Sequence, residues 1–232
     1  MSNPGITRHS ITGGESQSVL LPKESLLEVE TKSKNLFIGI PKETSFQENR
    51  IPLVPDSVRL LTNQGHRILI ETGAGNNSSF ADADYSEAGA QIVYSARDVY
   101  QADLILKVAP PSMEELEMMQ PKQTLISILQ ITMQKKDLIS QLTSKKITAL
   151  AYEFIRDDSG ALPIIQTLSE IVGSTSILIA SEYLSNTFSG RGEILGGISG
   201  IPPTEIVVLG AGVVGEYAAR AAIGLGANVK VF

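Results

Sequence analysis

Two basic side chains have the chemistry and the setting to bind a small carboxylic acid. Arg50 lies in "QENRIPLVP", shortly after the apolar run "LFIGI", and Lys107 lies inside the apolar run "DLILKVA". Arginine offers a planar pair of donors that matches a carboxylate. Lysine is almost never fully buried without a partner, so its position in so apolar a run is unusual. We therefore expect Arg50 and Lys107 to bind an anionic substrate.

Each of the two cations has a simpler explanation. Arg50 can form a surface ion pair with Glu48 or Glu43, which precede it in the same loop. Lys107 can stand at the edge of a strand and extend its ammonium group to water. Under these explanations the two side chains need not bind a substrate.

A glycine-rich turn near the end of the sequence has the chemistry of a phosphate site. In "EIVVLGAGVVGEYAARAAIGLGA", Gly210, Gly212 and Gly215 fit the pattern Gly-x-Gly-x-x-Gly between an apolar strand and an Ala-rich helix. Gly210 permits the sharp turn, Gly212 lets the backbone approach a pyrophosphate, and Gly215 lets the helix pack on the sheet. The helix N-terminus attracts anions through its free N–H groups. The pattern predicts dinucleotide binding; a plain strand–helix turn is the alternative.

The final residues, "NVKVF", begin another strand. In a Rossmann unit the acidic residue that holds the ribose hydroxyls comes just after this strand, so the choice between NAD and NADP depends on residues beyond Phe232. One strand–helix unit lacks the neighbouring strands that it needs. We therefore expect the chain to be a C-terminally truncated fragment.

The elements that must position these residues alternate between strand and helix. Short apolar runs predict strands, and helix-like stretches separate them, a pattern typical of a mostly parallel sheet with helices on both faces. The runs are "LFIGI", "RILIE", "QIVY", "DLILKVA", "TLISIL" and "ITALAYE"; the stretches between them are "PDSVRLLTNQG", "ADADYSEAGA", "SARDVYQA", "PSMEELEMMQ" and "TMQKKDLISQLTSKK".

Further candidates come directly after the predicted strands, because open parallel sheets bind ligands beyond the carboxyl ends of their strands. Gln130 comes after "TLISIL", and Tyr152 and Glu153 end "ITALAYE". We take Gln130 and Glu153 as candidate site residues, with Glu153 as a candidate substrate-binding residue.

The predicted fold is α/β: an N-terminal, flavodoxin-like, doubly wound parallel sheet domain, followed by the start of a Rossmann NAD-binding domain. Four segments result. The polar stretch 1–34 is predicted to be a mobile tail, 35–163 the catalytic domain, 164–190 an inter-domain helix, and 191–232 the beginning of the Rossmann domain.

Composition excludes several classes of function. The 232 residues carry a net charge of -6, with 42% apolar and 19% charged residues, and no basic cluster suggests nucleic acid. There is no cysteine, and the two histidines are far apart in sequence, so we expect no metal site. The N-terminus lacks the apolar core of a secretory signal, and Ser, Glu and Asn interrupt the longest apolar stretch. We expect a cytoplasmic protein that does not bind a membrane by itself.

Several motifs, in order, resemble the alanine dehydrogenase/nicotinamide nucleotide transhydrogenase family, and alanine dehydrogenases in particular. They are "IGIPKETSFQENRIPLVPDSVRLLTNQGH", "ETGAG", "ADLILKV", "AYEFIRDDSGALPIIQTLSEIVGS" and "GRGEILGGISGIPPTEIVVLGAGVVG". The resemblance implies a catalytic domain joined by a long helix to an NAD-binding Rossmann domain. It also implies interconversion of L-alanine with pyruvate and ammonia, generally by a hexamer.

The resemblance also implies roles for individual residues. Arg50 and Lys107 match the arginine and lysine that bind the substrate's carboxylate and carbonyl. Ser169 matches a serine that contacts the cofactor, and the phosphate loop corresponds to Gly210, Gly212, Val213, Val214 and Gly215. Gln130 stands where alanine dehydrogenases carry a catalytic histidine, and an amide is no acid or base near pH 7. Gln130 can still orient a carbonyl or a water molecule.

Three other functions remain open on the sequence. One is the NAD(H)-binding alpha subunit of a proton-translocating transhydrogenase, although the motif "FIWPAQ" of such subunits is absent near Gln130. The second is a non-catalytic NAD-binding relative, which the glutamine suggests. Saccharopine-type dehydrogenases are a more distant third.

Overall fold

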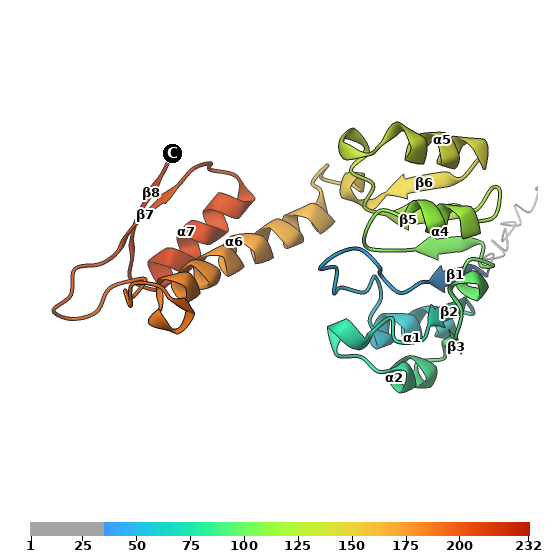
Figure 1. Ribbon diagram of the computed structural model, residues 1–232, viewed down its shortest axis with the longest axis horizontal. Helices are drawn as coiled ribbons and strands as arrows, with labels where there is room; N and C mark the ends of the chain where they lie inside the picture. The colour runs from blue at the N-terminus through green and yellow to red at the C-terminus, as the bar shows by residue number, and fades with distance from the viewer. Residues whose placement is uncertain (1–34) are drawn as a thin grey trace, which may run out of the picture. The chain divides into compact units, whose positions relative to one another are not determined.

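The structure is a computed structural model that describes residues 35–232, so the predicted N-terminal tail lies outside the described residues. Its larger part is a sheet of six parallel strands in the order β3-β2-β1-β4-β5-β6 (Figure 1). Each predicted strand is confirmed, with bounds β1 (Phe37–Ile40), β2 (Arg67–Glu71), β3 (Gln91–Val93), β4 (Leu104–Leu106), β5 (Thr124–Ser127) and β6 (Thr148–Ala151).

The strand order identifies the type of sheet. The short strand β3 is at one edge. Without it, the remaining five strands have the flavodoxin-like order, in which the second strand of the chain lies outside the first and the later strands extend the other side. The predicted doubly wound, flavodoxin-like sheet is therefore confirmed, with β3 as an additional edge strand.

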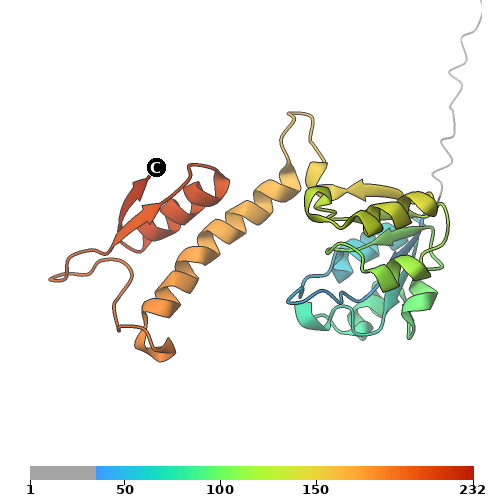
Figure 2. The same cartoon turned by 45° about the horizontal axis from the view of Figure 1, so that its top comes forward.

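Helices cover both faces of this sheet, as Figure 2 shows from a second direction. One face packs against α1 (Pro55–Asn63) and α2 (Asp82–Glu87), and its core contains Ile38, Ile40, Val58, Ile68, Ile70 and Tyr85. The other face packs against α3 (Ala96–Val99), α4 (Met113–Met118) and α5 (Lys136–Ser144), and its core contains Tyr100, Ile105, Leu116, Leu125 and Leu142. The two cores use alternate residues of the strands, because successive side chains point to opposite faces.

Local sequence explains where the first helix begins and ends. Pro55 stands in the first turn of α1 and Asp56 comes next, so the fixed φ of proline and a carboxylate near the helix dipole both favour a start there. Val58 faces the core. The chain leaves the helix through Gly65 at a φ of 90°, a conformation that glycine adopts without strain.

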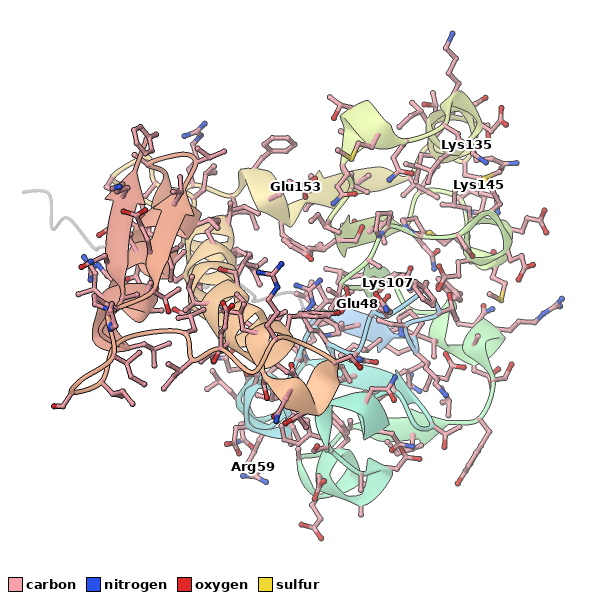
Figure 3. All side chains as sticks on the ribbon, turned by 60° about the vertical axis from the view of Figure 1, so that its left-hand side comes forward. Glu48, Arg59, Lys107, Lys135, Lys145 and Glu153 are labelled. Atoms are coloured by element: carbon pink, nitrogen blue, oxygen red, sulfur yellow. The ribbon has the colours of Figure 1, made fainter. Side chains whose placement is uncertain are left out.

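Lys145 joins α4 to the end of α5. Its Nζ atom donates to the backbone carbonyl oxygens of Leu116, Glu117 and Met119 at 2.6, 2.8 and 2.9 Å (Figure 3). These carbonyls lie at the end of α4, where a helix has no donor of its own for them and where a cation is favoured. This contact helps to fix α4, whose first turn forms part of the candidate site.

The predicted inter-domain helix is α6 (Pro163–Leu184), after which the chain turns through η4 (Asn186–Phe188). By length and composition α6 could cross a membrane, since a window of 18 residues has a mean hydropathy of 1.3. In the structure it packs against α7 (Val213–Gly224). Gly173 makes this close packing possible, because a Cβ there would collide with the backbone oxygen of Val214.

The end of the chain forms a small parallel unit. Strands β7 (Glu205–Val208) and β8 (Asn228–Val231) pair side by side, and α7 connects them. The apolar residues that α6, α7 and the neighbouring loops bury together are Ile177, Leu195, Ala218, Ala222 and Ala227. The predicted start of a Rossmann domain is therefore present.

Candidate active site

Lys107 is fully buried and held between two carboxylates. Its Nζ atom donates to Oε2 of Glu43 at 3.0 Å and to Oε1 of Glu115 at 2.8 Å, and its side chain is 0% exposed. Lys107 continues the alternation of β4, so it points to the same face as Ile105, where α4 packs. The alternative in which its ammonium group reaches water is therefore wrong for this structure.

Both carboxylates that hold Lys107 are themselves fixed by the backbone. Oε1 of Glu43 accepts the N–H of Val108 at 2.6 Å. Glu115 forms a capping box with Ser112: the N–H of Ser112 donates to Oε2 of Glu115 at 2.7 Å, and the N–H of Glu115 donates to Oγ of Ser112 at 3.1 Å. Buried charges need such paired and hydrogen-bonded surroundings. The position of the Lys107 ammonium group therefore depends on the loop after β1 and on the start of α4.

Arg50 forms a two-point ion pair with Glu48. Nε donates to Oε1 of Glu48 at 2.7 Å and Nη2 donates to Oε2 at 2.6 Å, while the backbone N–H of Arg50 also donates to Oε1 at 3.0 Å. This hydrogen bonding lowers the pKa of the Glu48 carboxyl and raises the pKa of the Arg50 guanidinium. The ion pair expected as an alternative for Arg50 is thus present, with Glu48 as the partner.

The two cations line one cavity. Its volume is about 410 Å³, and Arg50, Lys107 and Tyr152 are its polar residues. The rest of the wall is apolar: Ile51, Pro52, Leu53, Leu106, Val108, Ile126, Ile155, Ile164 and Leu168. A mostly apolar cavity with a few converging polar groups is typical of a small-molecule site. The structure therefore brings together the two basic residues that the sequence singled out.

Tyr152 links the wall of this cavity to the strand that carries Lys107. Its hydroxyl donates to the carbonyl oxygen of Val108 at 2.8 Å, and η3 (Tyr152–Phe154) places it directly after β6. Burial raises the pKa of the Tyr152 hydroxyl, although the nearby Arg50 charge acts in the opposite direction. Tyr152 is therefore a neutral hydrogen-bonding group near neutral pH.

Gln130 and Glu153 are linked to each other at the end of β5. Oε1 of Glu153 accepts the backbone N–H groups of Leu129 and Gln130 at 3.0 and 2.9 Å. Gln130 has a left-handed backbone, with φ 44° and ψ 49°, and it is exposed. Neither residue is part of the wall of the cavity that Arg50 and Lys107 line. Within residues 35–232, Oε2 of Glu153 is buried without a hydrogen-bond partner.

The predicted cofactor residues line a second cavity, of about 500 Å³, between β7 and the facing sides of α6 and α7. Its wall includes Ser169, Gly210, Gly212, Val213, Val214 and Gly215. Gly210 has a φ of 111°, and a Cβ on Gly215 would collide with the backbone oxygen of Gly210. Gly212 precedes α7, and within the described chain no side chain caps that helix start. The free N–H groups and the space at Gly212 fit a phosphate group.

Sequence reasoning missed the roles of two residues here. Glu115 has a detectable signal: "SMEE" is a capping-box pattern, and a lysine in an apolar strand requires a carboxylate partner. Glu43 appeared in the sequence only as a possible partner of Arg50, whereas it pairs with Lys107. No local pattern separates these two pairings, because Glu43 and Lys107 come from distant segments.

Comparisons with known proteins find matches to one family over most of the described chain. Residues 39–172 match the family described as "Alanine dehydrogenase/PNT, N-terminal domain", and residues 176–232 match "Alanine dehydrogenase/PNT, C-terminal domain". The alanine dehydrogenase of Mycolicibacterium smegmatis is 39% identical over 198 residues, which are 85% of this chain and 53% of that protein. That of Methanococcus maripaludis is 38% identical over 197 residues, which are 84% of this chain and 52% of that protein.

Two solved structures, of an alanine dehydrogenase and of a transhydrogenase, are also similar to this chain. A structure of an L-alanine dehydrogenase is similar with a TM-score of 0.79 and 42% identity, over 84% of this chain and 54% of that chain. A transhydrogenase from Sinorhizobium meliloti is similar with a TM-score of 0.74 and 28% identity, over 84% of this chain and 57% of that chain. The chain therefore spans about half the length of the relatives that it matches.

Proposed function

Because the chain belongs to the alanine dehydrogenase/PNT family, we propose that the protein interconverts L-alanine with pyruvate and ammonia, with NAD as the cofactor. The observation that carries this proposal is the cavity that Arg50 and Lys107 share. A small 2-oxo acid has a carboxylate and a neighbouring carbonyl oxygen; Arg50 offers a guanidinium at this cavity, and Lys107 in its wall carries a buried ammonium group. Its apolar wall suits a substrate with a short aliphatic side chain.

Arg50 binds the substrate's carboxylate in this proposal. Its guanidinium is always charged and has donors that Glu48 does not use. Lys107 polarises the substrate's carbonyl or imine group. An ammonium group has three donors, and Glu43 and Glu115 accept two of them. In this proposal the remaining N–H stabilises negative charge that develops on the substrate's oxygen, which requires the substrate to reach an ammonium group that is 0% exposed in the structure.

NAD, when bound, would supply the hydride acceptor for oxidation of the amino acid, and NADH the donor for the reverse reaction. The residues that hold the cofactor in this proposal are Ser169, Gly210, Gly212, Val213, Val214 and Gly215, which line one cavity. Gly212 leaves room for a phosphate at the start of α7, and Gly215 lets α7 approach the turn. The preference for NAD over NADP comes from the family, whose members use NAD.

The glutamine at position 130 bears on which group transfers the proton in the proposed reaction. An amide donates and accepts hydrogen bonds but does not act as an acid or base near neutral pH. In this proposal Gln130 can only orient a substrate carbonyl or a water molecule, and it would have to move to do so because it lies outside the wall of the Arg50–Lys107 cavity; another group moves the proton. The role of Glu153 in substrate binding stays a prediction; its contacts support the backbone of Gln130.

A second candidate function rests on the similarity to the Sinorhizobium meliloti transhydrogenase. The protein would then be the NAD(H)-binding subunit of a proton-translocating transhydrogenase, or a relative that binds NAD without chemistry. The buried Lys107 beside Arg50 favours the dehydrogenase, because hydride exchange between two nicotinamides needs no cation pair for a carboxylate.

The experiment that tests the proposal measures NAD reduction by the full-length protein with a panel of L-amino acids. L-alanine is expected to be the best substrate, and Arg50→Ala is expected to raise its KM. Absence of turnover with every amino acid, together with tight NADH binding, would favour the non-catalytic alternative. Hydride transfer between NADH and an NADP analogue would favour the transhydrogenase.

We further propose that the protein is a cytoplasmic homo-oligomer, a hexamer as its relatives imply, that binds neither nucleic acid nor a membrane by itself. Its net charge of -6 argues against a nucleic-acid partner. Size-exclusion chromatography with light scattering tests the number of subunits.

A further inference from the structure

We infer that Glu48 is a positioning residue: its carboxylate takes one edge of the Arg50 guanidinium and thereby presents the other edge to the substrate's carboxylate. This inference rests on the proposed function, because it assumes that Arg50 binds a carboxylate. It extends that function by assigning a role to a residue that does not itself touch the substrate.

The hydrogen bonds show which edge is taken. Glu48 accepts from Nε and from Nη2, which form the side edge of the guanidinium, at 2.7 and 2.6 Å. The end edge consists of Nη1 and the second hydrogen of Nη2. In the part of the chain that the structure describes, Nη1 has no hydrogen-bond partner. A guanidinium can bind a carboxylate through either edge with two parallel hydrogen bonds, so one complete binding edge remains for a ligand.

Burial supports the same division of roles. The Glu48 side chain is 12% exposed, whereas the Arg50 side chain is 52% exposed. The positioning carboxylate is therefore shielded from water, and the guanidinium extends past it to the cavity that it shares with Lys107. An exposed arginine samples many rotamers, and holding one of them costs conformational entropy. With Glu48 in place, this cost falls on folding and not on substrate binding.

Glu48 itself is fixed by its loop. Its backbone N–H donates to the carbonyl oxygen of Ser45 at 3.1 Å, and Gln47 has a left-handed φ of 60°. The next carbonyl oxygen, that of Asn49, accepts from Oγ of Ser78 at 2.6 Å. Figure 3 shows Glu48 in this loop near Lys107, and the Lys107 charge contributes to the lowered pKa of Glu48. The carboxylate is thus ionised and in place before a substrate arrives.

One competing interpretation makes the opposite prediction. If Glu48 occupied the edge that the substrate needs, it would act as an internal competitor, and its removal would strengthen substrate binding. The free end edge argues against this. The sign of the change in KM decides between the two interpretations.

The test compares the wild type with Glu48→Gln in the full-length protein, by steady-state kinetics with pyruvate, ammonia and NADH. Glutamine keeps the size of the side chain but has one acceptor oxygen in place of two and no charge, so it cannot form the two parallel hydrogen bonds to Nε and Nη2. The KM for pyruvate is expected to rise about tenfold, while kcat changes less than about threefold and the KM for NADH stays the same. The matched control is Asp56→Asn, which breaks the exposed Arg59–Asp56 pair and is expected to leave all three values unchanged.

A second arm shows whether Glu48 acts through Arg50. Lysine has no side edge to hold, so Glu48→Gln is expected to add no further rise in KM when Arg50→Lys is already present. A general loss of structure would add its effect in both backgrounds, and circular dichroism of each variant checks the fold. An unchanged or lower KM in Glu48→Gln alone overturns the inference, as does an undiminished effect in the Arg50→Lys background.

Failure of the proposed function gives a different pattern. In that case the wild type turns over no amino acid, and binding of pyruvate alone is measured by calorimetry. Weaker binding in Glu48→Gln than in the wild type still supports the inference. Equal binding in the two proteins, or none in either, overturns it.

Discussion

The two carboxylate oxygens of Glu115 bind different groups, the ammonium group of Lys107 and the backbone at the start of α4. Oε1 accepts from Nζ of Lys107 at 2.8 Å, and Oε2 accepts from the backbone N–H of Ser112 at 2.7 Å. One side chain therefore starts α4 and fixes the cation that we expect to act on the substrate.

Replacement of Glu115 by glutamine is expected to destabilise the protein by about 3 kcal/mol, because it removes one partner of a buried charge. Unfolding in urea, monitored by circular dichroism, measures this. The matched control is Glu114→Gln in the same first turn, where the side chain is exposed and the expected change is below about 0.5 kcal/mol. Equal effects of the two substitutions would contradict the assigned role of Glu115.

Gln130→His is expected to increase kcat by about tenfold or more, because an imidazole can transfer the proton that an amide cannot. Histidine also tolerates the left-handed backbone of this position better than most residues. The rate of the variant should acquire a dependence on pH near the ordinary pKa of histidine, about 6.5. A kcat that does not change would show that the glutamine does not limit the reaction.

Gly215→Ala is expected to abolish tight NADH binding, because the added Cβ would collide with the backbone oxygen of Gly210 and force α7 away from the turn. Gly224→Ala is the matched control in the same helix. Apart from its chain neighbours and the backbone of its own helix, no atom lies within 4 Å of its added Cβ, and alanine in place of a helical glycine stabilises by about 0.5–1 kcal/mol. NADH fluorescence titrations measure the binding, and tight binding by Gly215→Ala would contradict the assignment of the turn.

The buried Tyr85 is expected to make the protein less stable at alkaline pH. Its hydroxyl donates to the carbonyl oxygen of Leu53 at 3.0 Å, and burial raises its pKa to about 12. Because the folded pKa lies above the unfolded value of 10.0, the stabilisation is complete below pH 10 and is lost as the pH rises toward 12.

Tyr85→Phe tests this expectation. At pH 8 the variant should be less stable than the wild type by about 1 kcal/mol, the contribution of one hydrogen bond. Between pH 10 and pH 12 this difference should shrink, because the variant has no phenol to ionise. Urea unfolding at several pH values measures the change, and Tyr94→Phe, at a side chain that is 85% exposed, is the control. A difference that stays constant with pH would rule out the shifted phenol.

The sheet could be predicted from the sequence, because each strand is a short apolar run and helix starts have local signals such as Pro55 or Pro163. It also singled out Lys107, since a lysine in an apolar strand is unusual. The pairing of Lys107 with Glu43 could not be read in the same way. Glu43 and Glu48 are five residues apart in one loop, and their assignment to different cations depends on how that loop folds.

The backbone of Gln130 shows a different limit of sequence reasoning. A left-handed glutamine has no propensity signal, and it persists here because the carboxylate of Glu153 accepts its N–H from the neighbouring strand end. Such a conformation depends on a tertiary contact. The sequence placed Glu153 near the site, but only the structure shows that its hydrogen bonds go to the chain and not into the cavity.

Because the carboxylate of Glu115 both caps α4 and binds Lys107, heating should affect this site before it affects the sheet. Fraying of a single helical turn at Ser112 would remove Glu115 from Lys107 and leave it with Glu43 alone of these two carboxylates, while the six-stranded sheet remained intact. We therefore expect the arrangement around Lys107 to be lost at a lower temperature than the sheet, and substitutions that stabilise this one turn to delay that loss.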